Sequence, residues 1–228
     1  MRIQTIGDIH GEDIWHHIID IEGHDKVIFL GDYVDAWEVK DEKILSNLME
    51  IINLKKEHPD KIELLLGNHD NQYMFYPRHQ CSGFRPSMQQ SLFNVFNANK
   101  ELFKAAYQYK DTLWTHAGVT TNWFQRYFDA EDLFHYDNDV AAMLNELLAQ
   151  HNQWLFVAGW PRGGRGPGGP FWADDSELWQ DPLHGMTQVV GHTHQPEIKQ
   201  IESKRNNATL WFVDVLQSKN PDALTLNL

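Results

Sequence analysis

The first 66 residues alternate short apolar runs with segments of helical periodicity, and this alternation limits the fold more than any other feature. Residues 3–6, 26–30 and 62–66 have the length and apolar content of buried strands. Residues 12–22 and 41–58 place apolar side chains at helical spacing. This β-α-β-α-β order predicts an α/β layered fold with short connections.

The remainder of the chain continues the mixture of helices and strands. Further helices are predicted at 86–100 and 138–151, and further strands at 111–115, 187–190, 197–202, 208–215 and 223–226. Residues 160–170 are so rich in Gly and Pro that we expect a loop. We find no internal repeat and no linker, and 228 residues suffice for one well-packed core. A single domain over residues 1–228 is therefore predicted.

Five short polar motifs recur along the chain, each after an apolar run. They are Gly7-Asp8-Ile9-His10-Gly11, Gly31-Asp32-Tyr33-Val34-Asp35, Gly67-Asn68-His69-Asp70, Thr115-His116-Ala117-Gly118 and Gly191-His192-Thr193-His194. In open α/β sheets, ligands bind beyond the carboxyl ends of the strands. Because each motif follows a predicted strand, we expect segments far apart in the sequence to meet in one crevice.

The side chains in these motifs suit a pair of divalent cations. Asp8 and His10 stand two residues apart, as do His192 and His194, so each pair can contact one ion. Asp32 offers two carboxylate oxygens and can bridge two ions. Mixed oxygen and nitrogen ligands favour Mn²⁺, Fe, Zn or Co over Mg²⁺ or Ca²⁺. We therefore expect two divalent ions, with Mn²⁺ favoured, about 3.5–4 Å apart, as in sites that hold a phosphate and ionise a water.

A purely structural interpretation of the motifs is that they are turns, since Asp and Asn after Gly are common in turns. Turn chemistry does not explain His residues paired at a spacing of two, nor His after Asp at the same spacing. The metal-site hypothesis is therefore favoured. Trp37, Trp160 and Trp172 follow motif or loop positions, and each either walls a substrate pocket or has a purely structural role, with the structural interpretation slightly favoured.

Composition excludes some classes of partner. Lys and Arg number 19 against 32 Asp and Glu, and the net charge of −13 argues against non-specific binding to nucleic acid. The single cysteine, Cys81, excludes an internal disulfide and fits a reducing compartment. No apolar stretch reaches the roughly 20 residues of a membrane span, and no signal peptide is recognised. We expect a cytoplasmic protein without a membrane partner.

Taken together, the five motifs resemble those of calcineurin-like metallophosphoesterases, in the same order and over residues 7–194. The similarity is greatest to the phosphoprotein-phosphatase-like branch of that superfamily. The resemblance implies two packed mixed β-sheets flanked by helices, a four-layer sandwich, and a hydrolase with a binuclear metal centre. The metal ligands that it implies are Asp8, His10, Asp32 and His194 for the first ion, and Asp32, Asn68, His116 and His192 for the second.

The resemblance also implies roles for three residues that do not bind metal. His69 would act as general acid at the leaving-group oxygen, and Asp35 would hold its ring nitrogen and favour its charged form. Asp70 would brace the loop. The implied reaction is hydrolysis of a phosphate monoester, on a phosphorylated protein or small molecule, by attack of a metal-bridging hydroxide.

Two departures from the branch affect the predicted substrate. Ala36-Trp37 stands where an Arg-Gly pair is usual, and Leu66 stands where an arginine is usual. Arginine suits phosphate binding because of its guanidinium fork. Since both usual positions lack it, a phosphate-binding arginine must come from elsewhere in the chain. Arg162 is the first candidate, followed by three other arginines: Arg165, Arg78 and Arg85.

Two alternatives to a monoester phosphatase stay open. Residues 116–120 are similar to those of bacterial diadenosine tetraphosphate hydrolases, which favours a dinucleoside polyphosphate hydrolase or a phosphodiesterase. A non-catalytic scaffold with the same fold is the second alternative. Such scaffolds lack the proton-donating histidine, whereas His69 and all the ligand positions are present here. We therefore expect an enzyme.

Overall fold

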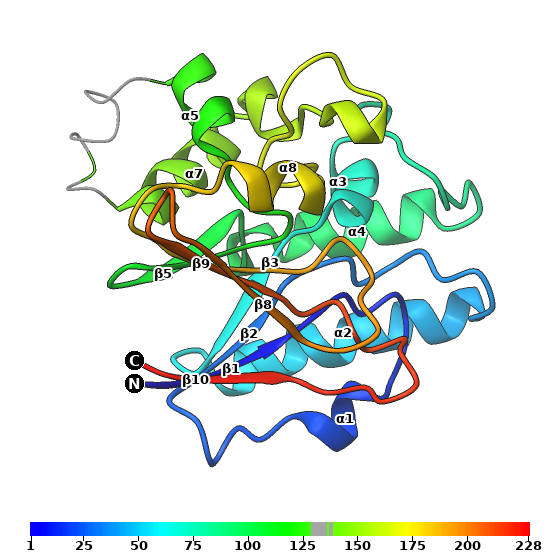
Figure 1. The fold of residues 1–228 in the computed structure, drawn as a ribbon. Helices are drawn as coiled ribbons and strands as arrows, with labels where there is room; N and C mark the ends of the chain where they lie inside the picture. The colour runs from blue at the N-terminus through cyan, green and yellow to red at the C-terminus, as the bar shows by residue number, and fades with distance from the viewer. Residues whose placement is uncertain (129–135, 137–138) are drawn as a thin grey trace.

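A computed structural model of the protein describes residues 1–128, 136 and 139–228. Two five-stranded mixed β-sheets pack face to face, with helices on their outer sides (Figure 1). This arrangement confirms the predicted α/β class with two mixed sheets flanked by helices. No helix in the described part of the chain is long and apolar enough to cross a membrane.

The first sheet contains the strands of the amino-terminal β-α-β-α-β segment. In spatial order its strands are β10 (Leu224–Asn227), β1 (Arg2–Ile6), β2 (Lys26–Phe29), β3 (Ile62–Leu65) and β4 (Phe103–Lys104). Strands β1 to β4 are parallel, and β10 is antiparallel to β1. The three predicted strands of this segment are thus found within a residue or two of their expected ends.

The second sheet contains the strands of the carboxyl-terminal half. In spatial order they are β5 (Ala106–Tyr109), β6 (Thr112–Thr115), β7 (Thr187–Val190), β9 (Ala208–Phe212) and β8 (Lys199–Ser203). Strands β6, β7 and β9 are parallel to one another, whereas β5 and β8 are antiparallel edge strands.

Helices cover the outer face of each sheet. They are α1 (Trp15–Ile18), α2 (Asp41–Glu57), α3 (Asn68–Met74), α4 (Gln89–Ala98), α5 (Thr121–Tyr127), α7 (Val140–Ala149) and α8 (Asp175–Gln180). Short 3₁₀ segments are η1 (Lys100–Leu102), η2 (Gln153–Phe156) and η3 (Trp160–Arg162). Helix α2 packs on β3 of the first sheet, and α7 packs on β5 and β6 of the second (Figure 1).

One core lies between the two sheets. Ile3, Leu65 and Trp114 belong to a cluster of fully buried apolar side chains that come from both sheets. The indole Nε1 of Trp114 donates to Thr5 Oγ1 at 2.9 Å, so the only polar atom of this ring is paired across the interface. Burying a large aromatic side chain contributes about 1.5–3 kcal/mol, provided that its N–H finds a partner.

The predicted helix at 12–22 is wrong in length, because α1 ends after a single turn. The backbone at Ile19 is extended, with ψ 132°. The side chain of Gln4 on β1 pairs with the chain here: its Nε2 donates to Ile18 O at 3.0 Å, and its Oε1 accepts from Asp20 N at 2.9 Å. These hydrogen bonds from β1 replace the next helical turn, so apolar spacing alone overestimated the helix.

The parallel strands of both sheets direct their carboxyl ends to one region. Of the five polar motifs, three follow β1, β2 and β3 of the first sheet, and two follow β6 and β7 of the second. Helix α3 begins within the third motif, directly at Asn68. The fold therefore brings together segments that are up to 184 residues apart, as the hydrogen bonds between Asp8 and His192 show.

Candidate metal centre and active site

Several backbone positions at this edge of the sheets have a left-handed conformation. His10, Asp32, Asp35 and His192 have φ values of 43°, 49°, 63° and 67°. Positive φ is uncommon for residues other than glycine, and it persists only where the surroundings hold it. Half of the eight such residues in the described part of the chain are predicted site residues. The turns at the strand ends therefore have strained backbones, and this conformation holds the side chains of these four residues at the edge of the sheets.

Asp32 lies at the centre of the cluster. Its Oδ2 is 3.3 Å from His116 Nε2 and 3.8 Å from His10 Nε2. Its Oδ1 accepts from the backbone N–H of His69 at 2.9 Å. Two sets of possible metal-ligand atoms, each within 4.8 Å, both include this carboxylate: His10, Asp32 and His69 form one, and Asp32, His116 and His192 form the other. One aspartate is thus shared by two adjacent candidate sites.

The second set is completed by Asn68. His116 donates from Nδ1 to Leu30 O at 2.9 Å, which directs its Nε2 toward Asn68 Oδ1 at 2.9 Å and His192 Nδ1 at 3.1 Å. A backbone partner on one ring nitrogen is the usual way in which a protein orients a ligating histidine. Burial lowers the pKa of His116, but the charges of Asp32 and Asp8 outweigh it and raise this pKa to about 9.

His192 differs electrostatically from its neighbour. Burial, and then the positive charge of His116, lower the pKa of His192 well below its usual value, so the ring is neutral. Its Nε2 is buried and has no hydrogen-bond partner in the described part of the chain. A buried nitrogen without a partner is costly unless something binds it. Neutral imidazole is the form that binds metal, so this orphaned atom fits a metal ligand.

The first motif contributes Asp8 and His10 to the cluster. Both oxygens of Asp8 accept from the backbone N–H of His192, at 3.1 and 2.9 Å. His10 donates from Nδ1 to the carbonyl oxygens of Val34 and Asp35, at 2.9 and 3.1 Å, which leaves Nε2 free. Two predicted ligands of the first ion, Asp8 and the exposed His194, belong to neither set of ligand atoms, and the first set contains His69 in their place. The first candidate site is therefore less complete than the second.

Asp214 is a site residue that the sequence analysis missed. It is 5% exposed, and its charge helps burial to raise the pKa of Asp8 well above the usual value. Burial also raises the pKa of Asp214, whereas the nearby imidazoles of His10 and His194 lower it. Asp214 follows β9, which is parallel to β7. The predicted strand at 208–215 included this position, whereas β9 ends at Phe212, so Asp214 was assigned to the strand and not to the polar residues that follow one.

His69 and Asp35 form a pair beside the first candidate site. His69 donates from Nδ1 to Asp35 Oδ2 at 3.0 Å. Asp35 also accepts from Gln72 Nε2 and, at 2.5 Å, from the hydroxyl of Tyr73. Burial lowers the pKa of His69, but the charge of Asp32 and the hydrogen bond to Asp35 outweigh it and raise this pKa to about 12. The ring is therefore protonated at neutral pH.

Asp70 holds the strand-end turns in place. Its carboxylate accepts from three backbone N–H groups: those of Asp32 and Gly67 at 2.8 Å, and that of Tyr33 at 2.9 Å. These bonds join the second and third motifs and fix the backbone of the central aspartate. The position agrees with the predicted bracing role.

The candidate arginines occupy different surroundings. Arg162 Nε lies 2.8 Å from Asp174 Oδ2, and its Nη2 donates to Thr193 Oγ1 at 2.6 Å. Its charge contributes to the lowered pKa of His192, which places it near the centre. Arg85 instead binds the loop at 36–41, as described below, and Arg165 is exposed without a side-chain partner in the described part of the chain. Arg162 is thus the arginine held closest to the fifth motif.

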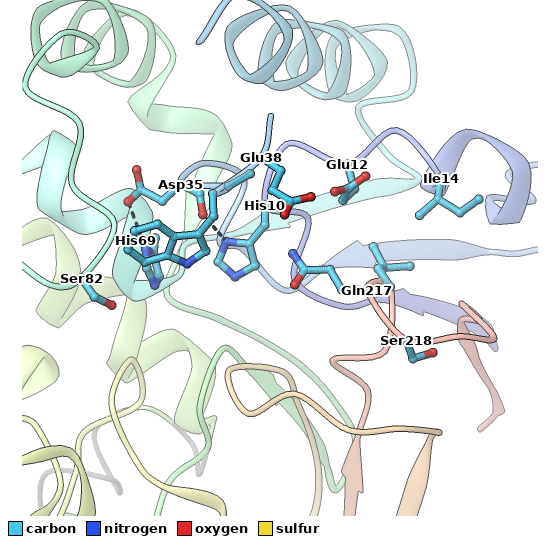
Figure 2. A pocket seen from close by; sticks show the side chains of 12 residues that line it. His10, Glu12, Ile14, Asp35, Glu38, His69, Ser82, Gln217 and Ser218 are labelled. Carbon is cyan, nitrogen blue, oxygen red and sulfur yellow. Dashed lines mark hydrogen bonds and ion pairs between the residues drawn. The ribbon is translucent and has the colours of Figure 1, made fainter. Parts of the chain in front are cut away.

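A pocket of about 610 Å³ opens beside this cluster (Figure 2). His10, Asp35 and His69 line its inner end. The rest of its lining comes from Glu12 and Ile14 after β1, residues 36–38 after the second motif, Ser82, and residues 216–218 after β9, and we call this part the outer wall. The pocket therefore connects the His69–Asp35 pair with solvent.

Comparison with known proteins places the chain in a family. A family model described as calcineurin-like phosphoesterase matches residues 1–196. No curated protein sequence matches the chain significantly. Among solved structures, the cold-active protein-tyrosine phosphatase of a psychrophilic Shewanella species aligns over 99% of this chain and 75% of its own, with 19% identity and a TM-score of 0.56. A protein serine/threonine phosphatase from Saccharomyces cerevisiae aligns over 93% of this chain and 67% of its own, with 16% identity and a TM-score of 0.50.

The chain belongs to the calcineurin-like phosphoesterase family, since the model covers most of its length and all five polar motifs. Family membership supports a metal-dependent hydrolase of phosphate esters. The two phosphatases share too little sequence identity to indicate more than a common fold. The kind of ester and the number of metal ions must be argued from the site itself.

Proposed function

We propose that the protein is a phosphatase that hydrolyses phosphate monoesters at a binuclear metal centre. The observation that carries this proposal is the shared position of Asp32, whose carboxylate belongs to two adjacent sets of ligand atoms. His69 belongs to one of these sets, but because its ring is protonated we assign it as a proton donor and not as a metal ligand. Two cations and one proton donor are the elements that in-line hydrolysis of a phosphate ester requires.

The residues present fit such a centre. His192 Nε2 is a buried nitrogen that lacks any other partner in the described residues, and the carboxylate and imidazole donors suit Mn²⁺, Fe, Zn or Co. Asp8, His10 and Asp32 would hold one ion, together with His194 if its exposed side chain turns inward. Asp32, Asn68, His116 and His192 would hold the other. When bound, the ions supply Lewis-acid stabilisation and lower the pKa of water to near neutrality.

His69 is the proposed general acid. Its Nδ1 is occupied by Asp35, so the proton on Nε2 is the one available to a departing oxygen. Asp35 holds the ring in this tautomer and keeps it charged, while Tyr73 and Gln72 hold Asp35 in turn. General acid catalysis of this kind contributes about 10²–10⁴-fold, and most for poor leaving groups.

Arg162 is proposed to bind the substrate phosphate. It is fixed by Asp174 and Thr193 and lies close enough to His192 for its charge to act on that ring. A guanidinium held in this way can offer its remaining N–H groups to phosphate oxygens without losing much conformational entropy. It would replace the arginines that Ala36-Trp37 and Leu66 do not supply.

A substrate panel assayed with added Mn²⁺ tests the proposal. The panel contains p-nitrophenyl phosphate, bis-p-nitrophenyl phosphate, a phosphoserine peptide and diadenosine tetraphosphate. We expect turnover of both monoesters, slower turnover of the diester, and complete loss of activity after chelation. Preferred cleavage of the dinucleotide would instead support the alternative of a dinucleoside polyphosphate hydrolase.

The variant His69→Asn tests the mechanism, with His17→Asn as the matched control because His17 is exposed. His69→Asn is expected to retain its metal ions and to lower kcat about 10²–10⁴-fold for an alkyl phosphate. His17→Asn should behave like the wild type. An unchanged kcat in the His69 variant, with metal retained, would remove this residue from the mechanism.

A further inference from the structure

The pocket beside His69 is acidic and aromatic. Glu12, Glu38 and Trp37 form part of its outer wall, and no lysine or arginine is among the residues that line it. Figure 2 shows both glutamate side chains on the side of the pocket between His10 and Ile14. We call the region formed by Glu12, Trp37 and Glu38 the acidic pocket wall.

Neither glutamate has a charge partner among the residues that the structure describes. In the described part of the chain, the carboxylates of Glu12 and Glu38 form no ion pair and accept no hydrogen bond. Other carboxylates near this region are paired: Asp13 with Lys43 at 3.0 Å, and Asp41 with Arg85 at 2.5 Å. Two unpaired carboxylates at a pocket that opens onto a phosphate-ester site repel anions and attract cations.

Trp37 adds an aromatic face to this negative field. Its side chain is 83% exposed, more than any other large apolar residue in the described part of the chain. Placing an indole in water has no structural benefit, whereas its π-face attracts an ammonium or guanidinium group. An indole beside two carboxylates is a suitable environment for a bound cation.

The wall is held in shape by residues behind it. Arg85 donates from Nη2 to Ala36 O and from Nη1 to Val39 O, so it fixes both ends of the segment that carries Trp37 and Glu38. On the other side, Asn47 Nδ2 donates to Glu12 O at 3.0 Å. These contacts hold the backbone of the wall in place before any ligand arrives, which lowers the entropic cost of binding.

The position of the wall determines which part of a substrate it faces. His69 lines the inner end of the same pocket, and the proposed function makes it the proton donor to the leaving-group oxygen. The group attached to that oxygen therefore extends into the pocket, whereas the phosphate itself stays at the metal ligands. The acidic pocket wall consequently contacts the leaving group.

We propose that Glu12, Trp37 and Glu38 select phosphate monoesters whose leaving group carries a cation, an ammonium or a guanidinium, near the ester oxygen. This inference rests on the proposed function and names its substrate class. A basic phosphopeptide and a small aminoalkyl phosphate share this chemistry, and the assay distinguishes them. A leaving group that carries further phosphates, as in a dinucleoside polyphosphate, is disfavoured by the same carboxylates.

The test compares pairs of substrates that differ only in charge. One pair consists of phosphoserine peptides flanked by Lys or by Glu, and the other consists of phosphoethanolamine and ethyl phosphate. Cation–π and carboxylate contacts each change affinity a few-fold, so we expect kcat/KM about tenfold higher for the cationic member, mainly through KM. The peptide pair shows the larger ratio if the natural substrate is a protein, and the phosphoethanolamine pair if it is a small molecule.

Variants of the wall residues test whether these residues cause the preference for the cationic substrates. In Glu12→Gln/Glu38→Gln and in Trp37→Leu the ratio between the paired substrates should fall towards one. The control is Glu57→Gln/Glu202→Gln, which likewise removes two negative charges, from exposed side chains at the end of α2 and on β8. It should keep the wild-type ratio. A ratio near one in the wild type, or a preference that survives in the double variant, would overturn the inference.

Equilibrium binding separates this inference from the proposed function. Non-hydrolysable phosphonate analogues of the two peptides are titrated against the protein and followed by fluorescence anisotropy. A tenfold lower Kd for the Lys peptide, if it is lost in the double variant, supports the proposed role of the acidic pocket wall even when no hydrolysis is observed. Equal Kd values contradict the proposed cation preference of the acidic pocket wall, even if p-nitrophenyl phosphate is hydrolysed rapidly.

Discussion

Replacing Asp35 with asparagine removes the negative charge that holds His69, and it hardly changes the volume of the side chain. Every side-chain neighbour of the Asp35 carboxylate is a donor: His69 Nδ1 at 3.0 Å, Gln72 Nε2 and the hydroxyl of Tyr73 at 2.5 Å. An amide has only one oxygen, so one of these donors meets an NH₂ group instead. The charged form of His69 is then less stable, and its pKa falls.

The size of this fall follows from the kind of hydrogen bond that is lost. A hydrogen bond to a charged group is worth about 1.5–3 kcal/mol, and 1.36 kcal/mol corresponds to one pKa unit, so the decrease is about 1–2 units. In the wild type, the charge of Asp32 and the hydrogen bond to Asp35 raise the pKa of His69 to about 12. In the proposed centre, cations on Asp32 would offset the contribution of its charge and would bring the titration of His69 into the range of a pH–rate profile.

The assay is the pH dependence of kcat for an alkyl phosphate, whose poor leaving group needs the proton. In the proposed mechanism the reaction requires protonated His69, so activity should fall as the pH rises through the pKa of this residue. The alkaline limb of Asp35→Asn should lie about 1–2 pH units below that of the wild type. The control is Asp60→Asn, which changes an exposed side chain without partners in the described residues. An alkaline limb that stays at the wild-type pH would refute the role of Asp35.

Three further changes have defined outcomes. Asp32→Asn removes the shared carboxylate, so metal analysis by mass spectrometry should find at most one bound ion in the variant and, according to the proposed function, two in the wild type. Glu63→Gln leaves the ammonium groups of Lys26 and Lys104, 3.0 and 2.9 Å from the carboxylate, without their buried partner. We expect a loss of about 2–3 kcal/mol in the free energy of unfolding at pH 7, measured in urea. Burial raises the pKa of Glu63, but the lysines outweigh it and lower this pKa. The ion pairs therefore stabilise the folded protein fully above the pKa that Glu63 has in the unfolded chain, and this stabilisation is lost as the pH falls through the pKa of Glu63 in the folded protein. The wild-type and variant stabilities should therefore converge in acid. Arg162→Ala should raise KM for p-nitrophenyl phosphate about tenfold or more, and an unchanged KM would exclude it as a phosphate ligand.

Strands β1, β2 and β3 were predictable because each is a short apolar run that ends at a glycine turn. β1, β2 and β3 begin and end within two residues of the predicted limits. The two-residue strand β4 was missed because so short a segment has no periodicity of its own. Helix α1 was overestimated because hydrogen bonds from Gln4 on β1 end it, and such long-range contacts leave no local pattern.

The centre of the site was predictable for the same reason as the strands. A polar residue directly after a parallel strand must lie at one edge of the sheet, so Asp32 and His116 could be placed near one another from sequence. The exposure of His194 could not be predicted from the sequence, because it depends on how the chain leaves the turn after His192. The Asp174 partner of Arg162 was equally inaccessible, since a salt bridge between two loops has no sequence signature.

Anomalous diffraction at the manganese absorption edge, from crystals grown with Mn²⁺, tests the binuclear centre most directly. Two peaks about 3.5–4 Å apart are expected, one on each side of the Asp32 carboxylate, with His192 Nε2 bound to one of them. A single peak, or two ions that share no carboxylate, would contradict the centre.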